Sequence, residues 1–378
     1  MDTVNGIDLI RGAKKISGKV RVFGEIGLSD PIVCSTHSPI ERIGPVSPDG
    51  KWVSIYRQGG LAGSSVISVV KASRNAREIP VHQYERWNNP IIRDITDDGR
   101  VLFDVWLRDG IHRMYRSESV GLFTVGDSHS FDLTSNVLDQ ETVPMNVRQW
   151  AISFTPDGKV FGADRRFDER DKSFPNPRYW RTCLWEEVKP NKWKMSYVLR
   201  NPSKPLSRLV GTGNYVWADR IDIESGWESI RFFVFDGKIH RFIDPVIKAR
   251  SFQIVAGGTD GSFLVNYDGN RETRRFPENG CLFRPGQNEA TFFTPNKELH
   301  STYLVNLSRD GKYAAGRHDG DCFVLTDSGD CTILRANGWR IDQLAAISNK
   351  GEVFALATCL DKKNDCYRLK LPISIRVR

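Results

Sequence analysis

The sequence predicts an all-β fold built from a repeated unit of short strands. Two observations carry this prediction: a polar, glycine-bearing corner occurs seven times, and each corner lies between two short apolar stretches. The corner glycines are 40 to 59 residues apart and are Gly50, Gly99, Gly158, Gly213, Gly261, Gly311 and Gly351. A unit of this length is too small to bury its own apolar faces, so it must stack on copies of itself.

The strands on either side of the corners are the clearest expected elements. Around the third corner, strands are expected at 150–154 and 159–163, and around the sixth corner at 303–307 and 312–316. β-branched and aromatic residues on both sides of an Asp-Gly turn are typical of a β-hairpin. A third strand is expected at 66–70, 182–185, 230–235 and 322–325, and a weaker fourth strand at 194–199.

Four antiparallel strands per unit, repeated seven times, predict a single seven-bladed β-propeller domain over residues 1–378. Residues 1–44 would form a closing strand and lead-in, and residues 45–378 the blades. The last unit lacks an outer strand, which either 373–377 or 19–23 could supply, so that the two chain ends pair and close the ring. Six or eight blades stay open as alternatives, because corners such as the fourth, fifth and seventh depart from the Pro-Asp-Gly form.

Two corners also carry a resemblance to known repeats. Ser47-Pro48-Asp49-Gly50 and Thr155-Pro156-Asp157-Gly158, each followed by a lysine and an apolar strand, resemble the TolB-type propeller repeat. Residues 307–316 are similar to bacterial repeats of the HAF type. This short, degenerate motif recurs over most of the chain, and the resemblance therefore implies the propeller fold and no particular activity.

The composition is that of a globular protein with a basic surface. The formal net charge is +8 and the pI is about 9.1, which favours an acidic partner without requiring one. The first residues lack the pattern of a secretory signal, and no stretch has 18 uninterrupted apolar residues, so we expect no membrane span and a cytoplasmic or virion location. The seven cysteines form no CxxC pair, so free thiols are expected, although a hairpin at 359–366 would allow a Cys359–Cys366 disulfide.

The repeated corner aspartates are expected to be structural. A carboxylate in a turn accepts hydrogen bonds from nearby backbone N–H groups, and glycine then supplies a positive φ. Because the aspartates belong to separate units, they are not expected to converge on a metal. The seven histidines include no HxH, HxxH or HxxxH pair, and no phosphate-binding or dinucleotide-binding motif occurs. We therefore expect no cofactor, no metal and no identifiable catalytic residue, although His318 beside Asp319 and Asp321 could act as a general base.

Arginine ends the second strand in four of the seven units. These residues are Arg57, Arg165, Arg220 and Arg317, six or seven positions after the corner glycine. Equivalent strand ends lie on one face of a propeller, where guanidinium groups could bind carboxylate or phosphate. The alternative is internal pairing with acids close in sequence, such as Asp164, Asp168, Asp219, Asp222 and Asp319.

Long insertions are expected on the same face, at 127–146, 166–180 and 268–277. They mix charges with aromatic residues, a composition that suits a protein interface. The partner-binding residues expected in two of these insertions are Arg166, Phe174, Arg178, Tyr179, Trp180, Arg271, Arg274 and Arg275.

The sequence thus favours a non-catalytic scaffold that binds a protein partner in a larger assembly, either a cellular complex or a virion. Two alternatives stay open. One is a hydrolase or lyase acting on an anionic glycan, which would need two converging acid or base groups. The other is nucleic-acid binding through the basic face, which the acids Asp168, Glu169 and Asp171 disfavour by repelling phosphates.

Overall fold

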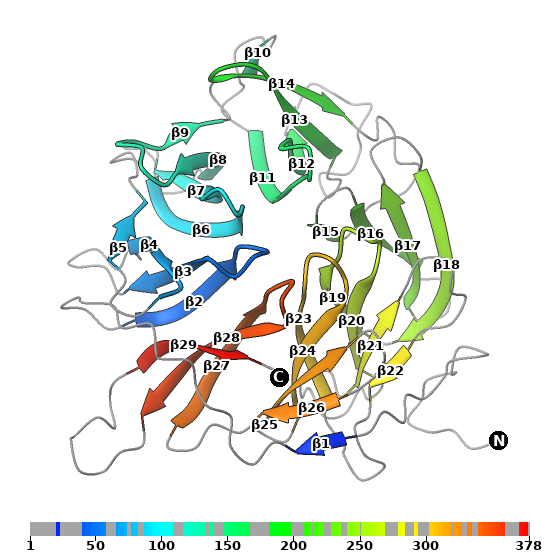
Figure 1. Ribbon diagram of the computed structural model, residues 1–378. Coiled ribbons are helices and arrows are strands. Elements are labelled where there is room, and N and C mark those ends of the chain that lie inside the picture. Colours follow the sequence, from blue (N-terminus) through cyan, green and yellow to red (C-terminus); the bar gives the residue numbers. More distant parts are fainter. Residues whose placement is uncertain are drawn as a thin grey trace. The chain divides into compact units, whose positions relative to one another are not determined.

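The fold is all-β in every segment that the computed structural model describes (Figure 1). It describes residues 20–22, 40–57, 66–73, 77–81, 87–108, 116–133, 137–138, 147–166, 181–197, 208–212, 215–222, 228–235, 240–249, 251–268, 279–283, 291–293, 302–318, 321–326, 331–334, 339–359 and 370–376. Within these segments there are 29 strands and no helix, and therefore no helix that could cross a bilayer. The chain divides into two compact units, residues 33–209 and residues 1–32 with 210–378.

The unit of residues 33–209 contains a four-stranded sheet and a nine-stranded sheet. The first has the order β2 (Ile40–Val46), β3 (Trp52–Arg57), β4 (Val66–Lys71) and β5 (Glu78–Pro80). The second joins two antiparallel groups, because β11 runs parallel to β8 at the single pair Arg148 and Glu118. One group is β6 (Trp87–Ile95), β7 (Arg100–Arg108), β8 (Arg116–Thr124) and β9 (Phe131–Asp132). The other is β11 (Val147–Phe154), β12 (Val160–Arg166), β13 (Arg181–Lys189), β14 (Lys192–Tyr197) and β10 (Val137–Leu138).

The other unit contains four sheets. The first consists of β15 (Arg208–Thr212), β16 (Tyr215–Asp222), β17 (Glu228–Phe235) and β18 (His240–Ala249). The second consists of β19 (Ser251–Gly257), β20 (Phe263–Asp268), β21 (Asn279–Phe283) and β22 (Thr291–Phe293). The third is β23 (Thr302–Leu307), β24 (Tyr313–His318), β25 (Asp321–Thr326), β26 (Cys331–Leu334) and β1 (Val20–Val22). The last is β27 (Trp339–Ile347), β28 (Glu352–Cys359) and β29 (Lys370–Arg376). The strands expected from the sequence are confirmed, with ends that differ by a few residues.

The two segments expected to complete the last sheet have different partners. The C-terminal segment does so, because β29 pairs antiparallel with β28. The N-terminal segment instead forms β1, which runs parallel to β26 in the preceding sheet, with Val20 opposite Cys331. The expected pairing of one chain end with the other is therefore wrong for these strands. The edge of β26 has unpaired backbone groups that a short strand can satisfy, and β1 takes this edge.

The corners have the expected turn chemistry. Glycine has a positive φ at six of the seven, namely Gly50, Gly99, Gly158, Gly261, Gly311 and Gly351, while Gly213 lies outside the described residues. In the first corner the Ser47 hydroxyl donates to Asp49 Oδ1 over 2.7 Å, and the Lys51 N–H donates to the same oxygen over 2.8 Å. In the third corner burial raises the pKa of Asp157, but hydrogen bonds from Thr155 and Lys159 outweigh it, so that the net pKa is lowered.

Neighbouring corners also contact each other, which the sequence did not predict. The Asp49 N–H donates to Asp97 Oδ1 of the next corner over 2.8 Å. The Asp310 N–H makes the equivalent bond to Asn349 Oδ1 over 3.1 Å. Gly311 has no room for a side chain, because a Cβ there would overlap the carboxylate of Asp260 in the preceding corner.

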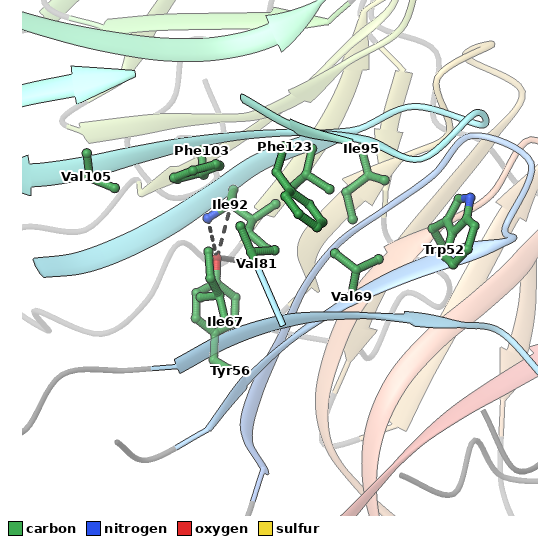
Figure 2. Close-up of a cluster of buried hydrophobic side chains, with 11 residues drawn as sticks. Trp52, Tyr56, Ile67, Val69, Val81, Ile92, Ile95, Phe103, Val105 and Phe123 are labelled. Carbon is green, nitrogen blue, oxygen red and sulfur yellow. Dashed lines mark hydrogen bonds between the residues drawn. The ribbon is translucent and has the colours of Figure 1, made fainter. Parts of the chain in front are cut away.

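The hydrophobic core lies between successive antiparallel groups of strands, which are either neighbouring sheets or the two groups of the nine-stranded sheet. In one cluster, Tyr56 and Ile67 of the first sheet pack with Ile92, Phe103 and other residues of the second (Figure 2). Similar clusters join β7 to β13, β20 to β24, and β24 to β28. Side chains on both sides of β7 and on both sides of β24 are thus buried, as expected for repeats that stack.

A β-bulge recurs in the first strand of the sheets, three residues before the corner. The strand pairing shifts there in β2, β6, β11, β19, β23 and β27. The residues at this position are Gly44, Arg93, Ile152, Val255, Val305 and Ala345. A bulge bends a strand and redirects one side chain, and Arg93 is the charged residue among the six.

In three places a polar side chain of one antiparallel group of strands accepts a hydrogen bond from the same backbone N–H of the next group. This N–H belongs to the residue four positions before the corner, and its acceptors are Tyr56 Oη for Ile92 at 2.7 Å, Asp104 Oδ1 for Ala151 at 2.7 Å and Asn266 Oδ1 for Leu304 at 2.9 Å. Figure 2 shows the first of these, with the Tyr56 hydroxyl directed at Ile92. Three different residue types therefore make one equivalent inter-sheet hydrogen bond.

Candidate functional site

Arg57, at the end of β3, is held inside its own sheet. Its Nε donates to Glu78 Oε2 over 2.9 Å, and its Nη2 pairs with Glu78 Oε1. The residue is only 5% exposed. A bidentate pair of this kind fixes both side chains. The acid belongs to β5, 21 residues further along the chain, and is not one of those expected from sequence proximity.

Arg317, at the equivalent end of β24, is bound differently. Its Nη2 donates to the carbonyl oxygen of Ile341 on β27 over 2.7 Å. Its Nε is buried and has no hydrogen-bond acceptor among the residues that the structure describes. A carbonyl oxygen leaves the guanidinium charge uncompensated, whereas a carboxylate does not. Arg317 is therefore better suited than Arg57 to contact an acidic group.

The other expected site residues are placed only in part. Arg165 and Arg166 lie at the end of β12, and Arg220 lies in β16 opposite Arg231 of β17. Phe174, Arg178, Tyr179, Trp180, Arg271, Arg274 and Arg275 lie outside the described residues. Arg57 and Arg165 belong to one compact unit, and Arg220 and Arg317 to the other. The expected convergence of the four arginines stays a prediction.

Two arginines that the sequence reasoning missed lie on first strands of the unit of residues 33–209. Arg42 of β2 lies over the ring of Tyr56, with its Cζ 3.9 Å from the ring centroid. Arg93 of β6 pairs through its Nε with Asp104 Oδ2 on β7. The available signal was the position of Arg93 three residues before a corner, where an apolar residue or glycine is usual in this chain.

Burial dominates the electrostatics around these arginines. It raises the pKa of the Asp104 carboxyl, although Arg93 and the Ala151 N–H favour the ionised form. Burial likewise raises the pKa of Tyr56, and the charges of Arg42 and Arg93 act in the opposite direction. Tyr56 is therefore a neutral hydrogen-bonding group at ordinary pH.

The described residues contain no group of three or more His, Cys, Asp and Glu side chains placed to hold a metal ion. Cys183 and Cys322 are buried and do not take part in a disulfide. The Cys359–Cys366 disulfide stays a prediction, because Cys366 lies outside the described residues. His318 ends β24, and its role as a general base also stays untested.

Comparisons with known proteins identify the fold. No family model and no curated protein matches the sequence. Among solved structures, the β-propeller domain of the Trilobed protease from Pyrococcus furiosus matches with a TM-score of 0.52 and 11% identity, covering 91% of this chain and 97% of that one. This fold is a β-propeller fold. At such identity the likeness concerns architecture alone.

Two further solved structures are similar. An oligogalacturonate lyase in complex with manganese has a TM-score of 0.52 and 10% identity, with 90% of each chain covered. A prolyl endopeptidase has a TM-score of 0.51 and 12% identity, covering 86% of this chain and 46% of that one. The neighbours are mostly peptidases and lyases.

Proposed function

We propose that residues 1–378 form one seven-bladed β-propeller domain that binds an acidic protein partner as a platform within a larger assembly. The seven corner glycines and the stacking of sheets through apolar clusters support the repeat architecture. The polar groups joining successive sheets support a rigid body, which suits a docking surface. A cellular complex and a virion are both compatible settings.

Arg317 carries this proposal. Its guanidinium is positioned by the Ile341 carbonyl, and its buried Nε has no acceptor among the described residues. A carboxylate from a partner that contacts the accessible part of this half-buried side chain would compensate the charge. The strand-end arginines Arg165 and Arg220 and the residues of the 166–180 and 268–277 insertions would extend the contact.

The test compares Arg317→Gln with Lys312→Gln in affinity capture of the full chain from its native source. Lys312 precedes the opposite end of the same strand and is 61% exposed, so its substitution removes the same charge elsewhere. We expect a partner retained by wild type and Lys312→Gln to be lost from Arg317→Gln. Equal capture by both variants would contradict the proposal, provided that both unfold at the wild-type denaturant concentration.

A hydrolase or lyase acting on an anionic glycan is the second candidate, and the similarity to the oligogalacturonate lyase favours it. The assay is incubation of the full chain with oligogalacturonate, with and without manganese. New reducing ends without new ultraviolet absorbance indicate hydrolysis, whereas new reducing ends together with the absorbance of an unsaturated sugar indicate a lyase. Turnover that Arg317→Gln abolishes and Lys312→Gln preserves would favour this candidate; no turnover of this substrate would count against it.

A further inference from the structure

Two exposed arginines from neighbouring first strands lie around one buried tyrosine. Arg42 belongs to β2 and Arg93 to β6, and these strands pack against each other. Both positive charges act on the Tyr56 hydroxyl, which is itself hydrogen bonded to Ile92, the neighbour of Arg93. Arg42 thus contacts the ring of Tyr56, and Arg93 directly follows the residue whose N–H binds the hydroxyl of that ring.

Arg42 keeps its full charge. Its contact is with the face of the Tyr56 ring, and it forms no ion pair with any carboxylate of the described residues. The ring is fixed, because Tyr56 is 2% exposed and its hydroxyl accepts the Ile92 N–H. A cation–π contact orients a guanidinium without neutralising it. Arg42 is thus positioned and available to an anion.

Arg93 is oriented by a carboxylate that has no freedom of its own. One oxygen of Asp104 accepts the Arg93 Nε–H, and the other accepts the Ala151 N–H of the next group of strands over 2.7 Å. The Arg93 side chain is 37% exposed, whereas that of Asp104 is 2% exposed. The bulge turns Arg93 out of the strand pairing, and the nitrogens not bound to Asp104 remain as donors.

The charges favour a ligand with a single negative charge. Arg42 and Arg93 contribute two positive charges, and Asp104 compensates one of them. One carboxylate would balance the remainder, and two guanidinium groups give it up to four donors in favourable geometry. A phosphate dianion would bring an excess of negative charge. The tyrosine is buried under Arg42, so its ring offers no exposed face on which a sugar could stack.

We propose that Arg42 and Arg93 form a carboxylate-binding site that takes a glutamate or aspartate side chain of an acidic peptide. This site belongs to the unit of residues 33–209, whereas Arg317 belongs to the other unit. The proposal does not depend on the role proposed for Arg317. Its function would be to dock an acidic segment of a protein against the first strands β2 and β6.

The experiment is titration of the full chain with a short glutamate-rich peptide, followed by fluorescence anisotropy at low and high salt. The peptide with glutamine in place of glutamate is the ligand control. Arg340→Gln is the protein control, because Arg340 is an exposed first-strand arginine that is already paired with Asp342. We expect wild type and Arg340→Gln to bind alike, Arg42→Gln and Arg93→Gln to bind about tenfold more weakly or worse, and added salt to weaken binding.

Arg93→Gln removes the partner of a buried carboxylate and can unfold the chain. Arg42→Gln leaves no buried carboxylate without a partner, because the contact of Arg42 is with the face of the Tyr56 ring. This variant therefore tests the proposal without unfolding the chain. Unchanged affinity in Arg42→Gln, no binding of the glutamate peptide to wild type, or equal binding of the glutamine peptide would overturn the proposal. Tighter binding of inorganic phosphate or digalacturonate than of the peptide would overturn the choice of ligand.

Discussion

Asp104 and Asn266 hold equivalent positions in the two units. Each accepts a backbone hydrogen bond from the next group of strands, but only Asp104 is an acidic residue. Each lies five residues after a corner glycine and captures the N–H four residues before the next corner. Asn266 also donates its amide to the Leu304 carbonyl over 2.7 Å, whereas Asp104 accepts from Arg93. The residue at the bulge in the neighbouring strand differs between the two positions. It is Arg93 in the strand beside Asp104 and Val255 in the strand beside Asn266, and we attribute the choice between aspartate and asparagine to this residue.

From this difference we expect an acidic residue to be tolerated at the inter-sheet position only where the bulge supplies a cation. Exchanging the two residue types should therefore have unequal consequences.

Asn266→Asp should destabilise the chain most. The new carboxylate would be fully buried, would face the Leu304 carbonyl without a donated hydrogen bond, and would have valine where Asp104 has arginine. An uncompensated buried charge costs about 3–5 kcal/mol. Urea unfolding of the full chain at neutral pH, followed by tryptophan fluorescence, measures the change. A decrease in unfolding free energy of less than about 1 kcal/mol would show that position 266 tolerates a charged side chain.

Tyr56→Phe should have the next largest effect. Removing the hydroxyl leaves the buried Ile92 N–H without its acceptor, which costs about 1–3 kcal/mol of unfolding free energy. Tyr313→Phe is the matched control, because the structure gives the Tyr313 hydroxyl no hydrogen bond among the described residues and its loss should change little. Equal unfolding midpoints for the two variants would contradict the role assigned to Tyr56.

Asp104→Asn should cost about 1 kcal/mol or less at neutral pH. The amide oxygen can still accept the Ala151 N–H, and Arg93 is exposed enough to be hydrated without its partner. Chemical unfolding of this variant beside Asn266→Asp gives the comparison directly. If the two substitutions lower the free energy of unfolding equally, the bulge residue does not determine whether aspartate or asparagine is tolerated.

The smallest effect is a difference in pH dependence. Because burial raises the pKa of Asp104 above its unfolded value, the folded state binds the proton more tightly than the unfolded state. Stability from this group is therefore present at low pH and falls as pH rises from the unfolded pKa to the folded pKa. The stability of wild type relative to Asp104→Asn should fall over that window and be constant above it. A difference that rises with pH would reverse the assignment.

Local patterns in the sequence predicted the corners and most strands. An Asp-Gly turn is determined by residues within four positions, so the Ser47–Asp49 bond and the positive φ of Gly50 could be anticipated. The partner of β1 could not be predicted, because any edge strand of suitable length satisfies a three-residue segment.

The candidate site was less predictable because its contacts are distant in sequence. Glu78 pairs with Arg57 across a sheet, and the search for acids near each arginine did not reach it. The recurring inter-sheet hydrogen bond could not be predicted either. Its acceptor is tyrosine, aspartate or asparagine, so no single residue type identifies the position in the sequence. Arg42 became notable only when the fold placed it over the Tyr56 ring.

The pairing of β1 with β26 has a consequence for biosynthesis. Val20 leaves the ribosome more than 300 residues before its partner Cys331, an interval of about 15–60 s at ordinary elongation rates. Residues 33–209 are completed within that interval and can form their sheets while the N-terminal strand still lacks its neighbour. Residues 20–22 are thus translated long before they can be incorporated, and nascent chains halted before residue 331 would carry this strand unpaired.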